Sequence, residues 1–169
     1  MATIIDNTYF TKELTLPVDN INIQTYIDEH EPIILRKALG YPLATEFKDA
    51  LDAGSPVQKW VDLRDGKEYE SYSGYNDKYE GIFSIIADYV YIQISKSIQT
   101  YATDGGVKSA NTENSIDYSP RYRQKFANDD MINRISKLDE FIRVTNDDTA
   151  DTYEDYLPES FEKMTVFNI

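Results

Sequence analysis

The sequence predicts a mainly α-helical fold, a helical bundle around a long central helix, with a small β-hairpin or loop insertion and extended terminal arms. Three observations predict it. Prolines and glycines recur at spacings typical of helix starts and ends, apolar residues recur every three or four positions, and one long segment is apolar on most of its sides. The length of 169 residues suits one domain.

The first part of the bundle is expected to contain four short helices. Proline favours the first position of a helix, and glycine favours the position just past its end. On this pattern helices are predicted at about 20–30, 32–39, 42–53 and 56–65, with starts at Pro32, Pro42 and Pro56, an N-cap at Ser55, and ends at Gly40, Gly54 and Gly66.

The next segment, residues 66–80, has a different composition. It reads GKEYESYSGYNDKYE, which is typical of a β-hairpin or an exposed loop. Tyrosines are difficult to bury in a segment rich in glycine, serine and asparagine, and exposed tyrosine is typical of protein interfaces. We therefore expect this insertion to project and to contact a neighbouring protein through Tyr69, Tyr72, Tyr75 and Tyr79.

Two long helices are predicted to follow. The segment from about 81 to 103 leaves only a thin polar strip among its apolar residues, which indicates a central, buried helix. The second helix is expected to start at Ser119-Pro120, with Ser119 as its N-cap. Its apolar residues form one core-facing seam, namely Met131, Ile135, Leu138 and Ile142.

The two ends of the chain are predicted to be arms, 1–18 and 147–169, on either side of a helical domain at 19–146. From 146 to 169 there are seven acidic residues and one lysine, a net charge of −6, whereas 119–145 has six basic and four acidic residues, a net charge of +2. The C-terminal arm is expected to dock on a partner through Tyr153, Tyr156, Phe161 and Phe167. The alternative is that it forms a last helix folded back on its own core.

The residue inventory argues against an enzyme. The chain has no cysteine, and its single histidine, His30, has no second histidine with which to form a triad. No phosphate-binding loop or dinucleotide fingerprint is present, so no catalytic residue and no cofactor is expected. The acidic cluster at 147–155 lacks the spacing of a calcium loop, so no metal site is expected either.

Charge and hydropathy also limit the partners. The net charge of −13 disfavours binding to nucleic acid, which requires lysine and arginine to displace counterions. No apolar run is long enough to span a membrane, and the N-terminus lacks the features of a signal peptide, so a cytoplasm-like location is expected.

Several segments of the sequence resemble a known family. They are ILRKALGYPLATEFKDAL, LRDGKEYESY, the long helix that opens with Tyr-Glu-Gly-Ile and ends with Thr-Asp-Gly-Gly-Val, and a last helix ending in KLDEFI. In this order, over about residues 20–145, they resemble the small head–tail connector (head-completion or ring) proteins of tailed bacteriophages, especially those of Bacteroidetes phages and prophages.

The resemblance implies a structural virion protein at the head–tail junction, assembled in the cytoplasm of the host bacterium. It implies a homo-oligomeric ring of about a dozen copies, which joins the portal or a neighbouring ring to tail proteins. DNA would pass through the channel without specific binding. Two alternatives remain open: another tail-side protein such as a tail terminator, and a small acidic regulatory or interaction protein.

Overall fold

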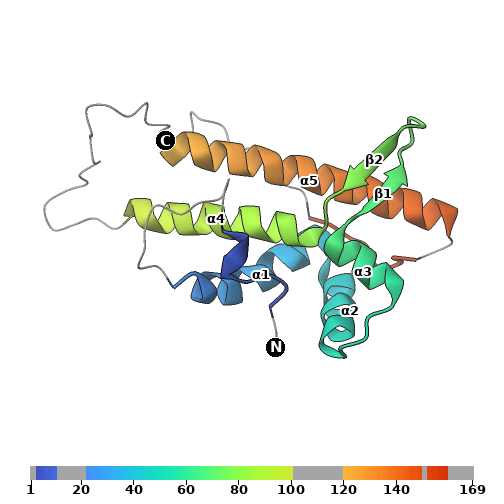
Figure 1. The fold of residues 1–169 in the computed structure, drawn as a ribbon, viewed down its shortest axis with the longest axis horizontal. Coiled ribbons are helices and arrows are strands. Elements are labelled where there is room, and N and C mark those ends of the chain that lie inside the picture. Colours follow the sequence, from blue (N-terminus) through green and yellow to red (C-terminus); the bar gives the residue numbers. More distant parts are fainter. Residues whose placement is uncertain (1–2, 11–21, 101–119, 150–151, 160–169) are drawn as a thin grey trace, which may run out of the picture.

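The computed structural model describes residues 3–10, 22–100, 120–149 and 152–159 (Figure 1). Within these ranges it is mainly helical, with one two-stranded antiparallel sheet, so the predicted fold class is confirmed. The elements are a short 3-10 turn η1 (Asn7–Tyr9), helices α1 (Ile23–Leu39), α2 (Tyr41–Asp52), α3 (Gln58–Asp65), α4 (Ile82–Thr100) and α5 (Pro120–Asp148), and strands β1 (Lys67–Glu70) and β2 (Asn76–Tyr79).

Helix α4 is the centre of the bundle, as its sequence predicts. It lies between α1 and α5 in Figure 1, and it contacts both of them as well as α3. A helix with neighbours on several sides must be apolar on several sides. Its fully buried side chains accordingly come from more than one stripe, and they include Ile82, Ile85, Ile86, Val90 and Ile94.

The prediction of two separate helices at 20–30 and 32–39 is wrong, because α1 runs unbroken through Pro32. An interior proline removes one backbone hydrogen bond and costs about 3 kcal/mol. Residues on both sides of the proline share one buried face, including Ile27, Ile34 and Leu35, and this burial offsets the cost. The helix ends at Gly40, whose φ of 86° is the glycine conformation expected there.

The next two helices differ in how well their starts were predicted. Pro42 lies in the first turn of α2, as expected. The predicted start of α3 with Ser55 as its N-cap is wrong, because Val57 occupies the N-cap and no side chain caps this helix. Val57 has an extended backbone, with ψ at 160°, so the chain is still extended after Pro56.

Strands β1 and β2 form the hairpin, in which Lys67 pairs with Tyr79 and Glu70 pairs with Asn76. Gly66 precedes it with a φ of 88°, and a Cβ atom there would lie 2.2 Å from the carbonyl oxygen of Tyr79. Glycine is therefore required where α3 meets the hairpin. The hairpin contacts α5, and its tip extends past that helix in Figure 1.

The described part of the N-terminal arm, residues 3–10, packs on the bundle. Ile5 and Phe10 are buried, and the fully buried carboxylate of Glu31 accepts hydrogen bonds from the backbone N–H groups of Ile4 and Ile5, at 2.8 and 3.3 Å. This part of the arm is thus an element of the core, which its irregular apolar pattern did not indicate.

The prediction that the C-terminal arm does not pack on its own bundle is wrong for residues 152–159. Helix α5 continues to Asp148, past the expected break at Asn146. Asn146 then pairs with the backbone of Tyr153 through both its oxygen and its nitrogen, and Tyr153 is 1% exposed. Further along, Leu157 and Glu159 donate backbone hydrogen bonds to the carbonyls of Leu39 and Lys37, at 3.1 and 2.8 Å.

Candidate interaction surface

The hairpin separates its four predicted interface tyrosines into two pairs. Tyr69 and Tyr79 are buried, so the expectation that they are exposed is wrong. Side chains alternate between the two faces of a strand, and both of these rings lie on the face that packs on Phe141 of α5, with ring centroids 5.8 and 5.0 Å away. The hydroxyl of Tyr79 donates to the carbonyl of Leu63 at 2.9 Å.

The other pair, Tyr72 and Tyr75, lies at the tip of the hairpin and is 63% and 75% exposed. The tip itself is well ordered by hydrogen bonds. The backbone N–H of Ser71 donates to the carbonyl of Tyr75, and that of Gly74 donates to the carbonyl of Ser71. The tip therefore presents two large rings on a fixed backbone, which lowers the entropy lost on binding.

Carboxylates of α5 fix the orientation of the tip. The Tyr72 hydroxyl donates to Asp147 at 2.7 Å, and the Tyr72 backbone N–H donates to Glu140 at 3.3 Å. The hydrogen bond to Asp147 raises the pKa of Tyr72, because it favours the neutral phenol. These residues form an acidic aromatic surface, called here the tip surface: Tyr72, Tyr75, Glu140 and Asp147.

The predicted C-terminal interface residues do not form a single exposed group. Tyr153 is buried between Trp60 and Phe141, and its hydroxyl donates to the carbonyl of Lys59 at 2.8 Å. Tyr156 is half-buried against the same core. Phe161 and Phe167 lie outside the described residues.

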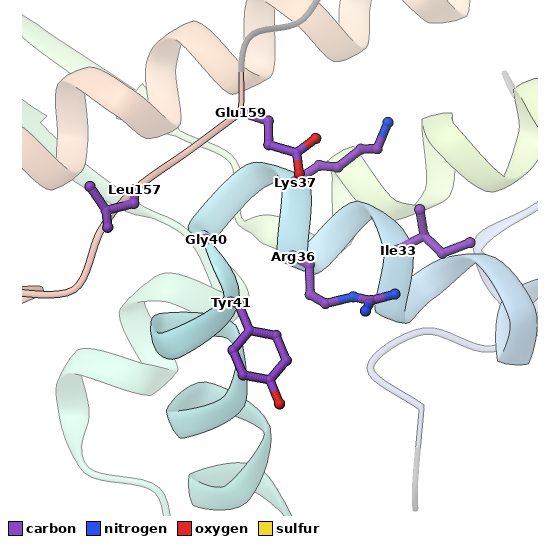
Figure 2. Close-up of a pocket in the computed structure, with 7 residues that line it drawn as sticks. All are labelled: Ile33, Arg36, Lys37, Gly40, Tyr41, Leu157 and Glu159. Atoms are coloured by element: carbon purple, nitrogen blue, oxygen red, sulfur yellow. The ribbon is translucent and has the colours of Figure 1, made fainter.

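A pocket of about 330 Å³ lies where α1 ends and α2 begins (Figure 2). Figure 2 shows Ile33, Arg36 and Lys37 on the last turns of α1, Tyr41 at the start of α2, and Leu157 and Glu159 on the segment that crosses α1. Tyr41 and Leu157 are 68% and 70% exposed. The crossing segment approaches so closely that a Cβ atom on Gly40 would lie 2.7 Å from the carbonyl oxygen of Leu157.

Sequence reasoning did not identify this pocket. Its lining residues come from segments more than a hundred positions apart, and Leu157 belongs to the arm that was expected to leave the bundle. The only local signal was the pair of adjacent cations, Arg36 and Lys37, in a strongly acidic chain.

Two buried carboxylates have perturbed pKa values, and both are held in structural contacts. Burial raises the pKa of Asp88 to about 7, and the ion pair between Asp88 and Arg134 of α5 opposes this effect. Arg134 also pairs with Glu80, which is partly exposed. Burial likewise raises the pKa of Glu31, which pairs with Lys48 at 3.3 Å. Each carboxylate joins two elements of the bundle, and neither lies in the pocket.

His30 lies between Tyr26 and Tyr89, with ring centroids 6.0 Å away on each side. Its Nδ1 atom is buried without a hydrogen-bond partner. Among the residues that the structure describes, no group of three or more histidines and carboxylates is arranged to hold a metal ion. The described surface offers exposed rings and carboxylates at the hairpin tip and cations at the pocket.

Comparisons with protein-family models, with curated proteins and with solved structures found no match to this chain. Within the described ranges, no helix has the length and apolar character required to span a membrane.

Proposed function

We propose that this chain is a structural subunit of a head–tail connector ring in a tailed bacteriophage, where it joins the portal to the tail and lines part of the DNA channel. The observation that carries the proposal is the tip surface, because it exposes two tyrosines on a hydrogen-bonded turn. Tyrosine is one of the residue types enriched at the few positions that dominate the energy of a protein interface, and a rigid support lowers the entropy lost on binding.

The acidic composition supports the same role. A net charge of −13 opposes binding to DNA, so DNA would pass through a channel built from such subunits without being retained. The sequence resemblance over residues 20–145 supports the specific location at the head–tail junction.

The test is the state of assembly of the purified chain. Light scattering and electron microscopy across a concentration series should show closed rings of the wild-type protein. Replacing Tyr72 and Tyr75 together by serine should leave the circular dichroism spectrum unchanged and raise the concentration needed for assembly by at least about tenfold, as the loss of interface aromatics does.

A matched control is Phe126→Ser, which removes another exposed aromatic ring, on α5 and outside the tip surface. This variant should assemble like the wild-type protein. A wild-type chain that stays monomeric at every concentration, or a double tyrosine variant that assembles normally, would contradict the proposal.

A further inference from the structure

The pocket at the end of α1 is lined by two cations, Arg36 and Lys37, and by one carboxylate, Glu159, so its lining carries a net charge of +1. No carboxylate of the described residues lies within 4.0 Å of the charged nitrogens of Arg36 or Lys37. Arg36 uses one of its five N–H donors on the carbonyl of Pro32, at 3.2 Å. Arg36 and Lys37 lie in the last turn of α1, where the helix dipole favours positive charge. The dipole does not occupy hydrogen-bond donors, so the remaining side-chain N–H groups of these two residues can bind a ligand.

The pocket also offers apolar contacts beside these cations. Ile33, Tyr41 and Leu157 line it, and Tyr41 and Leu157 are largely exposed. Its volume of about 330 Å³ is at the lower end of the range of about 300–1,000 Å³ found for small-ligand sites. Such a site suits a ligand that combines an aromatic ring with a carboxylate.

The tip surface has this combination of groups. Tyr72 and Tyr75 supply exposed rings, and Asp147 supplies an exposed carboxylate beside Tyr72. The nearby cation Arg143 pairs with Asp139 at 2.9 Å, so it does not cancel the negative charge of the tip. The two surfaces are therefore complementary in charge, and each exposes apolar area that is unfavourable in water.

One copy of the chain cannot bring its own tip to its own pocket. In Figure 1 the hairpin tip lies beyond one side of α5, whereas α2 lies beyond the other side of the bundle. The hairpin is also held to α5 by Tyr69 and Tyr72 through Glu140. A contact between these surfaces therefore requires two molecules.

We propose that the tip surface of one copy binds the pocket lined by Arg36, Lys37 and Tyr41 on the next copy. This contact joins two different surfaces, so each copy offers one of each to its neighbours, and repetition produces a ring if the rotation closes. The inference rests on the proposed function only in requiring that the chain self-associate.

The absence of native cysteine makes a direct cross-linking test possible. Ser73→Cys, in the hairpin tip, and Thr45→Cys, one helical turn after Tyr41, are prepared as separate proteins, because these exposed positions leave the tyrosines of the contact in place. A short bis-maleimide reagent is added to each protein alone and to their mixture. The mixture should yield a covalent dimer, and each protein alone should not. A mixture of Phe126→Cys with Thr45→Cys provides the matched control for random collision.

Charge reversal then tests the recognition itself. Arg36→Glu combined with Lys37→Glu, placed in the Thr45→Cys protein, should lower the yield of cross-linked dimer by at least about tenfold, because like charges would face each other. Adding Asp147→Lys to the Ser73→Cys protein should restore part of the yield. Arg123→Glu in the Thr45→Cys protein is the control and should have no effect.

The outcomes separate this inference from the proposed function. If the wild-type protein forms rings but the Ser73→Cys and Thr45→Cys proteins cross-link no better than the control pair, the inference is wrong and the ring proposal stands. Efficient cross-linking of the Ser73→Cys protein alone would show tip-to-tip contact and would also overturn it. A wild-type protein that neither assembles nor cross-links overturns both.

Discussion

Tyr153→Ala tests whether residues 152–159 belong to the core of their own subunit. The Tyr153 ring is 1% exposed, and its centroid lies 6.1 Å from that of Trp60 and 6.2 Å from that of Phe141. Truncation of a buried aromatic residue costs about 3–5 kcal/mol, so the free energy of unfolding should fall by this amount. Tyr153→Phe should cost only about 0.5–1.5 kcal/mol, because it keeps the ring and loses the hydrogen bond to Lys59.

Urea unfolding provides the measurement. Circular dichroism follows the helices, and fluorescence follows Trp60, which is the only tryptophan in the chain and contacts Tyr153. Tyr75→Ala is the matched control, because this tyrosine is 75% exposed and its loss should change stability by no more than about 0.5 kcal/mol. If Tyr153→Ala unfolds at the same urea concentration as Tyr75→Ala, the C-terminal segment does not pack as described and docking on a partner becomes the better account.

Three further predictions concern the interior, and all are measured by chemical unfolding. Ile86→Ala, in the middle of the central helix, should cost about 2–5 kcal/mol, and unchanged stability would show that α4 is not central. Gly66→Ala should be more destabilising than Gly54→Ala, because both have positive φ but only at Gly66 would a Cβ meet the Tyr79 carbonyl; equal costs would contradict this. Burial raises the pKa of Asp88 from 3.8 to about 7, so the folded protein binds this proton more tightly than the unfolded chain does. The resulting stabilisation, on the order of 4 kcal/mol, is fully present below about pH 4 and is lost as the pH rises through 7. Asp88→Asn should remove this component of the pH dependence, and curves of equal slope for the two proteins would refute it.

The starts and ends of helices were predicted correctly where they depend on the backbone conformation of a single residue. Gly40 and Gly66 end their helices with positive φ, a conformation that few other residues adopt, and Pro42 lies in the first turn of its helix. Pro32 misled the prediction, because a proline that starts a helix and a proline that a helix tolerates look the same in sequence. The packing of α1 on α4 distinguishes them.

The candidate site was predicted only in part for a similar reason. A segment rich in glycine and serine indicates a hairpin, but it does not indicate which face of the hairpin meets α5. That contact buries Tyr69 and leaves Tyr72 and Tyr75 exposed. The pocket could not be predicted from local sequence, since Leu157 comes to lie beside Leu39 and Gly40 only after the chain has completed the whole bundle.

The helical class, the position of the central helix, the hairpin or loop insertion and the strongly acidic character could all be predicted from the sequence, because they follow from local periodicity, turn chemistry and composition. The positions of the described parts of the two ends, in contrast, depend on how the helices pack. The backbone N–H groups of Ile4 and Leu157 are bound by Glu31 and by the Leu39 carbonyl, partners that lie 27 and 118 positions away in the chain. Contacts over such separations depend on how the helices pack, and no local pattern of residues encodes them.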